Sequence, residues 1–314
     1  MSNDTGRILV IGSGGQIGVE LTIALRKKYG NDRVIASDLK DESPLLTGTG
    51  AFYQLDALNK EQVQLLIKEQ HITQVYLLAA VLSAVGEQKP LLAWDINMKA
   101  LMNVLEIARE EKLKRIFWPS SIAVFGPTSP KQNCPQHTII EPSTVYGISK
   151  YAGESWCEYY FQKYGVDVRS LRYPGIISYK SAPGGGTTDY AIDIFHEARK
   201  NKSYNCFLKE DTYLPMMYMD DAINATMELM EAPLENIKTH RSYNLAGISF
   251  SPKEIAAEIQ KHIPDFTIHY TPDFRQAIAD SWPQSIDDSE ARADWHWQHQ
   301  YDLAAIVKDM LEHI

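Results

Sequence analysis

The chain has 314 residues, a net charge of −9 and no long lysine or arginine run, which argues against nucleic acid or an anionic membrane as its main partner. Its length is sufficient for one large α/β domain with a smaller lobe. No apolar run approaches the roughly 20 residues of a transmembrane helix, so we expect no membrane partner.

The first predicted element is a strand over residues 7–12, which a glycine-rich turn connects to a helix over residues 19–28. The turn carries Gly12, Gly15 and Gly18, each separated by two residues. Strand, tight turn and helix are the context that a dinucleotide-binding motif needs. Gly12 permits the turn, Gly15 lets the backbone approach a pyrophosphate, and Gly18 lets the helix pack on the strand. An ordinary strand-to-helix loop is the alternative.

The second predicted strand, residues 33–38, ends in Asp38, twenty positions after Gly18. A carboxylate there accepts hydrogen bonds from the ribose hydroxyls of adenosine and repels a 2′-phosphate. Lys40 argues in the other direction, because a cation two residues later could bind that phosphate. We predict NAD rather than NADP as the cofactor.

Strand-like and helix-like segments then alternate along the chain. The strand-like segments are 51–56, 74–80, 115–121 and 166–173, and the helical ones are 60–69, 91–111 and 144–164. This alternation predicts an α/β fold with a doubly wound parallel sheet of the Rossmann type, with helices on both faces.

After Pro174 the pattern changes, and we expect a smaller C-terminal lobe over the carboxyl ends of the strands. It begins with a glycine-rich loop, and its predicted elements are helices at 190–200, 252–262 and 302–313 and a strand at 267–270. We predict a dinucleotide-binding domain from 1–175, to which part of 205–247 returns. Residues 176–204 and 248–314 would form the smaller substrate-binding lobe.

Tyr146 and Lys150 lie four residues apart on the predicted helix 144–164, so their side chains share one face. A phenol has a pKa of about 10, too high for a base at neutral pH, and a nearby cation lowers it. The alternative is an ordinary solvated helix face. The glycine turn upstream favours a catalytic pair.

These motifs together resemble the extended short-chain dehydrogenase/reductase family over nearly the whole chain. Residues 118–126 are similar to the family segment that carries a third catalytic hydroxyl, which implies Ser121 beside Tyr146 and Lys150. The family also implies a homodimer formed through the helices 91–111 and 144–164. The cofactor-binding residues that the resemblance implies, besides Gly12, Gly15, Gly18 and Asp38, are Gln16, Ile17, Leu39, Leu55, Asp56, Leu78, Ala79, Ala80, Asn97, Tyr146, Lys150, Tyr173 and Pro174.

Within that family, the stretches 183–191, 213–221 and 281–289 resemble the short-chain type of L-threonine 3-dehydrogenase, which is related to UDP-galactose 4-epimerases. The resemblance implies oxidation of L-threonine at C3 to 2-amino-3-oxobutyrate, with hydride transfer to NAD and Tyr146 as general base. The alternative is a nucleotide-sugar 4-epimerase with tightly bound NAD. The epimerases typically carry an asparagine shortly after the tyrosine, and residues 174–177 contain none.

The substrate-binding candidates are polar groups and one aromatic that would hold threonine: Ser83, Ser120, Ser121, Tyr146, Gly185, Gly186, Thr187, Thr188 and Trp282. For Thr187 and Thr188 the alternative is a mobile polar loop, and for Trp282 it is a plain core aromatic.

Several other groups that could carry chemistry are predicted to be structural. Cys134, Cys157 and Cys206 are scattered thiols, which suits a reduced cytoplasm, and the N-terminal residues show no secretion signal. We therefore expect a cytoplasmic protein. His296 and His299 lack a third ligand nearby, so no metal site is predicted.

Overall fold

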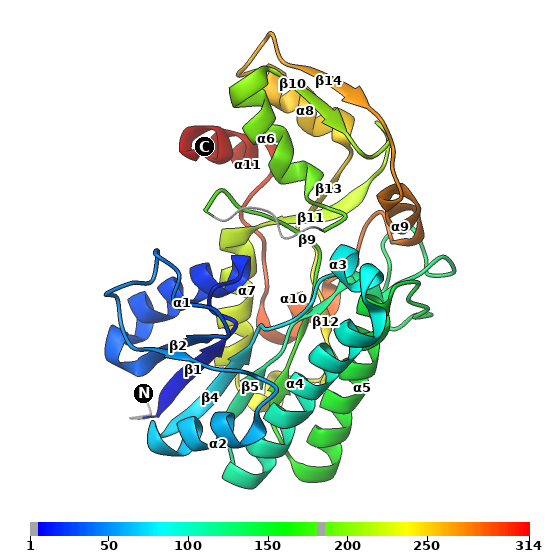
Figure 1. Cartoon of the computed structure of the whole chain (residues 1–314). Helices are drawn as coiled ribbons and strands as arrows, with labels where there is room; N and C mark the ends of the chain where they lie inside the picture. Colours follow the sequence, from blue (N-terminus) through cyan, green and yellow to red (C-terminus); the bar gives the residue numbers. More distant parts are fainter. Residues whose placement is uncertain (1–5, 181–185) are drawn as a thin grey trace.

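The computed structural model describes residues 6–180 and 186–314, and its largest sheet has six parallel strands (Figure 1). These are β1 (Arg7–Ile11), β2 (Val34–Asp38), β3 (Phe52–Gln54), β4 (Ile72–Leu77), β5 (Arg115–Phe117) and β7 (Val168–Arg169). They lie in the order β3-β2-β1-β4-β5-β7, and every neighbouring pair is parallel. The predicted doubly wound α/β fold is confirmed.

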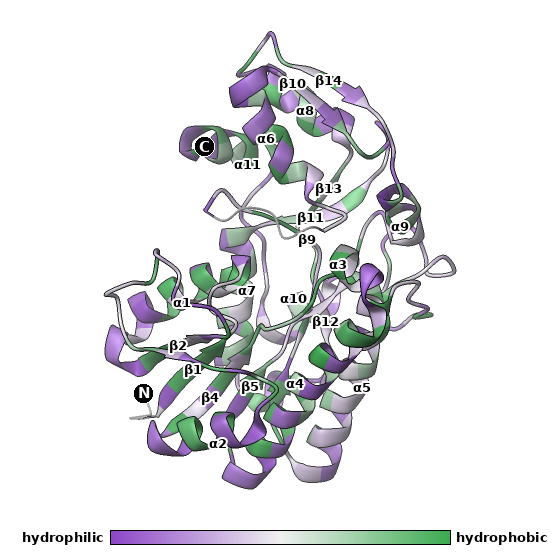
Figure 2. Cartoon of the chain, viewed as in Figure 1, coloured by the Kyte–Doolittle hydropathy of each residue, from purple (hydrophilic) through white to green (hydrophobic). Residues whose placement is uncertain are grey.

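Helices cover both faces of this sheet because its strands are apolar on both faces. Ile8 and Val10 of β1 belong to an apolar cluster with α1 (Gln16–Tyr29) and α7 (Met219–Glu231). The intervening Leu9 and Ile11 belong to a second cluster with α2 (Lys60–Glu69), α4 (Pro90–Glu111) and α5 (Val145–Tyr164). Figure 2 shows the hydrophobic strands between helices whose outer faces are polar. Such continuous apolar strands are typical of parallel sheets covered on both faces.

The predicted strand 115–121 is interrupted in the structure, and this interruption builds the site. Proline has no backbone N–H to give to a sheet, and Pro119 separates β5 from β6 (Ser120–Ser121). The strand β6 pairs instead with β8 (Leu171–Tyr173), which also pairs with β12 (Tyr243–Asn244). The predicted strand 166–173 is likewise divided into β7 and β8. Ser120 and Ser121 therefore leave the main sheet at its carboxyl edge.

The smaller upper part of Figure 1 has its own apolar core. It contains α6 (Tyr190–Asn201), α8 (Pro252–Gln260), α11 (Leu303–His313) and the parallel pair β10 (Ser203–Cys206) and β14 (Thr267–Tyr270). A further three-stranded sheet, β9 (Gly175–Ile177), β11 (Leu214–Tyr218) and β13 (Ile248–Phe250), lies between the two parts. The remaining elements are α3 (Ser83–Gln88), α9 (Arg275–Ser281), α10 (Ser289–Trp295) and the 3₁₀ turns Asn31–Arg33, Ile122–Val124 and Leu234–Asn236. The exact domain boundaries stay a prediction.

Side chains at the helix ends explain small shifts from the predicted bounds. Thr144, predicted as the first residue of its helix, is instead the N-cap of α5 and accepts a hydrogen bond from the Gly147 N–H at 3.0 Å. Asp302 caps α11 in the same way. The helices α3, α7, α9 and α10 were not predicted. None of the described helices is long and apolar enough to cross a bilayer.

Candidate active site

The glycine turn after β1 is closed by contacts between backbone atoms. Gly12 has φ +91°, and a Cβ added there would lie 2.6 Å from the Ala79 nitrogen. A Cβ on Gly18 would lie 2.1 Å from the Gly12 carbonyl oxygen. Gly15 differs, because its nearest neighbour would be that same oxygen at 3.5 Å, an ordinary contact. The protein itself therefore requires glycine at positions 12 and 18, and it leaves room beside position 15.

Asp38 is fixed beside this turn at the carboxyl end of β2. Its Oδ2 accepts a hydrogen bond from the Gly14 N–H at 2.9 Å, and its Oδ1 accepts one from the Lys40 N–H at 3.0 Å. The carboxylate thus lies next to the glycine turn, where the sequence predicts the adenosine ribose. The Lys40 contact comes from its backbone.

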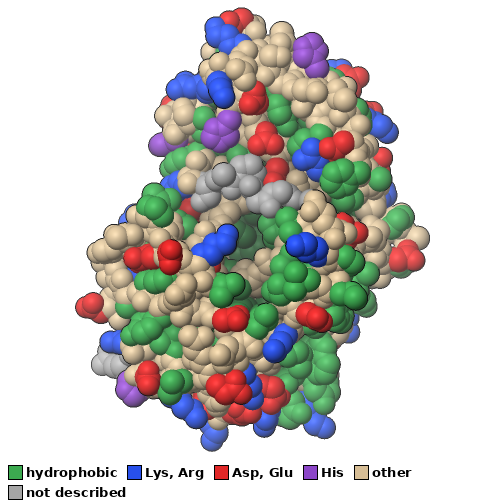
Figure 3. Space-filling model, in the orientation of Figure 1, with side chains coloured by type: hydrophobic (Ala, Val, Ile, Leu, Met, Phe, Trp, Pro, Cys, Tyr) green, Lys and Arg blue, Asp and Glu red, His purple; other side chains and the backbone are tan. Residues whose placement is uncertain are grey.

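A cavity of about 250 Å³ lies between the two parts of the molecule, where Figure 3 shows a hollow in the middle of the face. It brings together most of the predicted site residues from both parts of the chain. Those that line it are Gly12, Gly15, Gln16, Ile17, Gly18, Leu78, Ala80, Ser83, Ser120, Ser121, Tyr146, Lys150, Tyr173, Pro174, Gly186, Thr187, Thr188 and Trp282. Gly185 lies outside the described residues.

Six predicted cofactor residues do not line this cavity: Asp38, Leu39, Leu55, Asp56, Ala79 and Asn97. Leu55 is buried in the apolar core, so its side chain packs against other side chains of the protein and does not face the cavity. Asp56 accepts a hydrogen bond from the Leu58 N–H at 2.9 Å. Asn97 clamps the backbone of Val81, accepting from its N–H at 2.7 Å and donating to its carbonyl at 3.1 Å. Asn97 does not line the cavity and therefore holds the segment after β4 in place from outside it.

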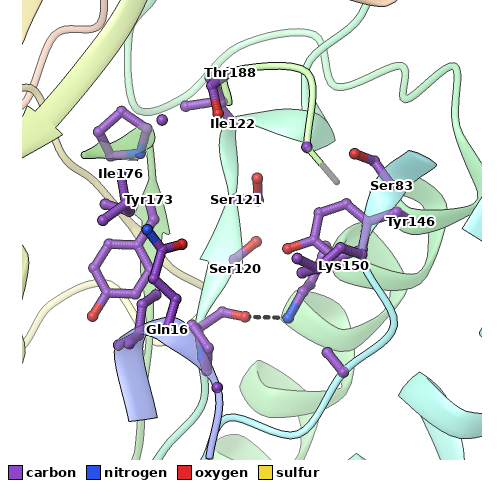
Figure 4. Close-up of a pocket in the computed structure, with 18 of the residues that line it drawn as sticks. Gln16, Ser83, Ser120, Ser121, Ile122, Tyr146, Lys150, Tyr173, Ile176 and Thr188 are labelled. Atoms are coloured by element: carbon purple, nitrogen blue, oxygen red, sulfur yellow. Dashed lines mark hydrogen bonds between the residues drawn. The ribbon is translucent and has the colours of Figure 1, made fainter. Parts of the chain in front are cut away.

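Three catalytic candidates converge on the cavity from two elements. Figure 4 shows Ser120 and Ser121, on β6, beside the Tyr146 ring, near the start of α5. Lys150, one turn after Tyr146, donates a hydrogen bond from Nζ to the Pro119 carbonyl at 2.6 Å. Its ammonium also lies 4.5 Å from the centre of the Trp118 ring. The predicted set of Ser121, Tyr146 and Lys150 is assembled in one place.

Burial perturbs both titrating members of this set. It raises the pKa of Tyr146 to about 12, and the hydrogen bond from Ser121 opposes that rise. Burial lowers the pKa of Lys150 to about 7, which Cys157 and Glu154 oppose. Ser121 is the group that lowers the pKa of the phenol in the structure, and the same effect expected of Lys150 stays a prediction. Strongly perturbed groups in a cavity are typical of catalytic sites.

Sequence reasoning missed two charged residues directly behind Ser120. The Ser120 hydroxyl donates to Glu154 Oε1 at 2.6 Å, so its proton is already engaged. Glu154 is fully buried and pairs with Arg172 on β8. The spacing of Glu154 four residues after Lys150 is the one sequence signal that could have identified it.

Two polar side chains with free hydrogen-bonding atoms face the cavity from the C-terminal part. Thr187 is 1% exposed, and its hydroxyl has no partner among residues 6–180 and 186–314. Trp282 is 5% exposed, and its indole N–H has no partner in that part of the chain either. Trp282 belongs to the apolar cluster of this part and also lines the cavity, and its contact with a substrate stays a prediction. Buried polar groups without partners are rare and suit a ligand that supplies them.

Asp189 also lines the cavity and was not predicted. Its carboxylate accepts a hydrogen bond from the Gly186 N–H at 2.6 Å, which ties the turn before α6 together. Among the described residues, no group of histidine, cysteine and carboxylate side chains could hold a metal ion. All three cysteines are buried and free.

The residues around the turn fit a dinucleotide. Gly15 leaves space for a ligand, and the Gln16 amide nitrogen and the Ser13 hydroxyl are buried there without partners among the described residues. A helix that begins directly after such a turn binds phosphate through its free N–H groups. The site could therefore hold the pyrophosphate at the start of α1 and the ribose at Asp38.

Comparison with known proteins agrees with this geometry. A model described as the NAD dependent epimerase/dehydratase family matches residues 8–246. The chain is 48% identical over 309 residues to the mitochondrial L-threonine 3-dehydrogenase of Bos taurus, covering 98% of this chain and 82% of that protein. A GalE-like L-threonine dehydrogenase from Cupriavidus necator, solved in its holo form, is 56% identical with a TM-score of 0.96, covering 98% and 99% of the two chains. A monomeric L-threonine 3-dehydrogenase from a metagenome is 48% identical with a TM-score of 0.93, covering 97% of each chain.

Proposed function

Because this chain belongs to the NAD dependent epimerase/dehydratase family, we propose that it is an NAD-dependent dehydrogenase that oxidises L-threonine at C3 to 2-amino-3-oxobutyrate. The convergence of Ser121, Tyr146 and Lys150 on one cavity carries this proposal, because the set suits removal of a hydroxyl proton. The two relatives named above from Bos taurus and Cupriavidus necator support threonine as the substrate.

Bound NAD would supply the hydride acceptor, and the residues of this chain would do the remaining work. Tyr146, as phenolate, takes the proton of the C3 hydroxyl. Ser121 donates a hydrogen bond to the same oxygen and orients it. Lys150 holds its ammonium beside the phenol, where it favours the phenolate, and the Pro119 carbonyl fixes that ammonium.

The rest of threonine is charged and needs partners that the cavity offers. The free Thr187 hydroxyl and the free Trp282 N–H are donors for its carboxylate. Trp282 also supplies an apolar surface for the side-chain methyl. Ser83, Thr188 and Gly186 complete the proposed substrate site, with Gly185 outside the described residues.

Asp38 supports NAD rather than NADP within this proposal. Its two oxygens are held by the N–H groups of Gly14 and Lys40. A fixed carboxylate at this place accepts from the ribose hydroxyls and repels a 2′-phosphate.

We expect NADH absorbance at 340 nm to grow when the purified protein meets L-threonine and NAD. Parallel reactions contain NADP in place of NAD, or UDP-galactose in place of threonine. No growth with threonine, together with interconversion of the nucleotide sugar without net NADH, would contradict the proposal and support the second candidate, a nucleotide-sugar 4-epimerase. The family description, which includes epimerases, favours this second candidate, since epimerases share the cofactor residues.

We further propose a homodimer that forms through α4 and α5. Both helices present exposed apolar side chains, including Leu91, Leu92, Ile148, Trp156 and Tyr159. Figure 3 shows hydrophobic side chains gathered at the lower right, where α4 and α5 lie in Figure 1. Burial of this surface would remove a patch that monomeric proteins seldom expose.

Light scattering on the eluting protein should give twice the chain mass of 35.6 kDa at micromolar concentration. Trp156→Glu places a charge in the proposed interface and should give the single-chain mass. The matched control is Phe274→Glu, which alters an exposed aromatic away from these helices and should stay dimeric. A single-chain mass for the unmodified protein, as the name of the metagenome relative describes for that protein, would contradict the dimer.

A further inference from the structure

We propose that Glu154 is a positioning residue of the active site, which fixes the segment 119–121 through Ser120 and holds Lys150 in its ammonium form. The inference rests on the proposed function, since it assigns a task to a residue directly behind the same catalytic set. Glu154 touches neither the cavity nor the expected reacting atoms.

Glu154 forms a buried, hydrogen-bonded ion pair with Arg172. Arg172 donates to it twice, from Nε to Oε1 at 2.9 Å and from Nη2 to Oε2 at 2.8 Å. Ser120 donates to Oε1 at 2.6 Å. Glu154 is 0% exposed and Arg172 is 2% exposed, so water does not weaken these bonds. The remaining donors of Arg172 bind the Gln136 carbonyl and the Asn244 side chain.

Ser120 connects this ion pair to the catalytic set. Its two neighbours in the chain both lie at the catalytic set, because the Pro119 carbonyl accepts from Lys150 and Ser121 lines the cavity beside Tyr146. Figure 4 shows Ser120 and Ser121 along one short strand beside Tyr146 and Lys150. One buried carboxylate therefore fixes the piece of backbone that positions both the phenol and the ammonium.

Glu154 also provides the charge that Lys150 needs. On α5, Lys150 has Tyr146 before it and Glu154 and Cys157 after it. The neighbouring segment adds the neutral Trp118 ring and the Pro119 carbonyl, while Arg172 faces Glu154. Cys157 and Glu154 are the two groups that oppose the loss of the Lys150 proton.

Burial raises the pKa of Cys157 above its usual value, so this group is a neutral thiol at working pH. Glu154, which forms an ion pair with Arg172, is then the group that favours the ammonium form of Lys150.

The variant Glu154→Gln keeps the shape of the side chain and removes its charge. Lys150 should then lose its proton at a lower pH, while the pKa of the phenol changes less because Tyr146 lies two turns from position 154. Below about pH 6 both proteins hold the ammonium, so their kcat values should be similar. At higher pH, Tyr146 and Lys150 together should lose a proton mainly from Lys150 in the variant.

We therefore expect kcat at high pH to fall about tenfold. The acidic limb of the plot of kcat against pH should move about one pH unit lower, since a nearby charge shifts a pKa by about 1–3 units.

The KM for L-threonine should change little, since Glu154 does not line the cavity. The variant Glu154→Asp keeps the charge and should restore part of the kcat at high pH.

The control is Asp167→Asn, which breaks a buried pair of the same geometry outside the cavity. Arg169 donates to Asp167 from Nε and Nη2, both at 2.9 Å. This variant should lower the thermal midpoint and leave the pH dependence of kcat unchanged. If Glu154→Gln lowers kcat by the same factor at every pH, its role is structural and the inference is overturned. If Glu154→Gln does not fold, Glu154→Gln with Arg172→Gln leaves two neutral amides in place of the pair, and the same shift of the limb is expected.

A second measurement does not depend on turnover. Denaturant unfolding between pH 6 and 9 compares the parent, Lys150→Met, Glu154→Gln and the double variant. A lysine whose folded pKa is lowered costs stability at low pH, and this cost diminishes as pH rises through the folded value toward the unfolded one. The stability difference that Lys150→Met causes should therefore become constant below about pH 7 in the parent. In the Glu154→Gln background, the stability difference that Lys150→Met causes should continue to change below that pH.

Identical pH profiles in the two backgrounds would overturn the inference about Glu154. Absence of turnover of L-threonine by the unmodified protein would instead overturn the proposed function, and the unfolding data would still decide on Glu154.

Discussion

Replacing Tyr146 with phenylalanine should lower kcat for L-threonine oxidation by about 10²–10⁴-fold, the usual contribution of a general acid or base. The ring stays in place, so packing against Ser121 and the affinity for NAD should change little. The remaining activity should also lose the fall in rate at low pH. That fall is expected of the unmodified protein because the base is the deprotonated phenol, whose pKa burial raises to about 12.

Steady-state kinetics between pH 6 and 10, together with an NAD titration by fluorescence, would measure both effects. Tyr164→Phe is the matched control, since it removes a phenol hydroxyl at the exposed end of the same helix. Turnover of Tyr146→Phe near that of the control, with NAD bound, would show that another group takes the proton.

Replacing Gly18 with alanine should destabilise the protein by about 1–3 kcal/mol or more and remove saturable NAD binding. The new Cβ would lie 2.1 Å from the Gly12 carbonyl oxygen and 2.9 Å from the Ser13 Cα. Both are backbone atoms of the turn, so the turn itself must open. Thermal unfolding and calorimetric NAD titration would measure the two losses together.

The variant Gly15→Ala tests NAD binding separately from the stability of the fold. Its Cβ would be 3.5 Å from the nearest protein atom, so the thermal midpoint should stay close to that of the parent. If a pyrophosphate approaches the backbone here, the methyl group should weaken NAD binding about tenfold or more, which is about 1.4 kcal/mol. Unchanged NAD affinity in Gly15→Ala would place the pyrophosphate elsewhere.

The fold could be predicted in most of its larger elements because their signals are local. The alternation of apolar strands and amphipathic helices predicts the parallel sheet, and the capping residues Thr144 and Asp302 place the starts of α5 and α11 within one residue. The helix α3 has six residues, too few to show a helical period. The division of 115–121 was missed because the apolar pattern continues across Pro119, although the missing N–H ends the pairing there.

The candidate site could be predicted only in part. Spacing together with the glycine turn upstream pointed to Tyr146 and Lys150, because residues four apart share a helix face. Asn97 was assigned to the cofactor site, but the structure shows its side chain clamped on Val81. Glu154, Arg172 and Asp189 were missed, since their partners lie at sequence distances that no local pattern reports.

The sequence by itself determined the order of the larger strands and helices, the glycine turn, the carboxylate that ends β2 and the spacing that puts Tyr146 and Lys150 on one helix face. Each depends on interactions within a few residues of the chain, which recur wherever the same residues occur. Only the tertiary structure decided which hydroxyls lie beside Tyr146, and that a buried Glu154–Arg172 pair lies behind Ser120. It also decided that Thr187 and Trp282 bring to the cavity polar groups with no partner among the described residues. These depend on desolvation and on contacts between segments far apart in the chain, and packing of the complete chain sets both.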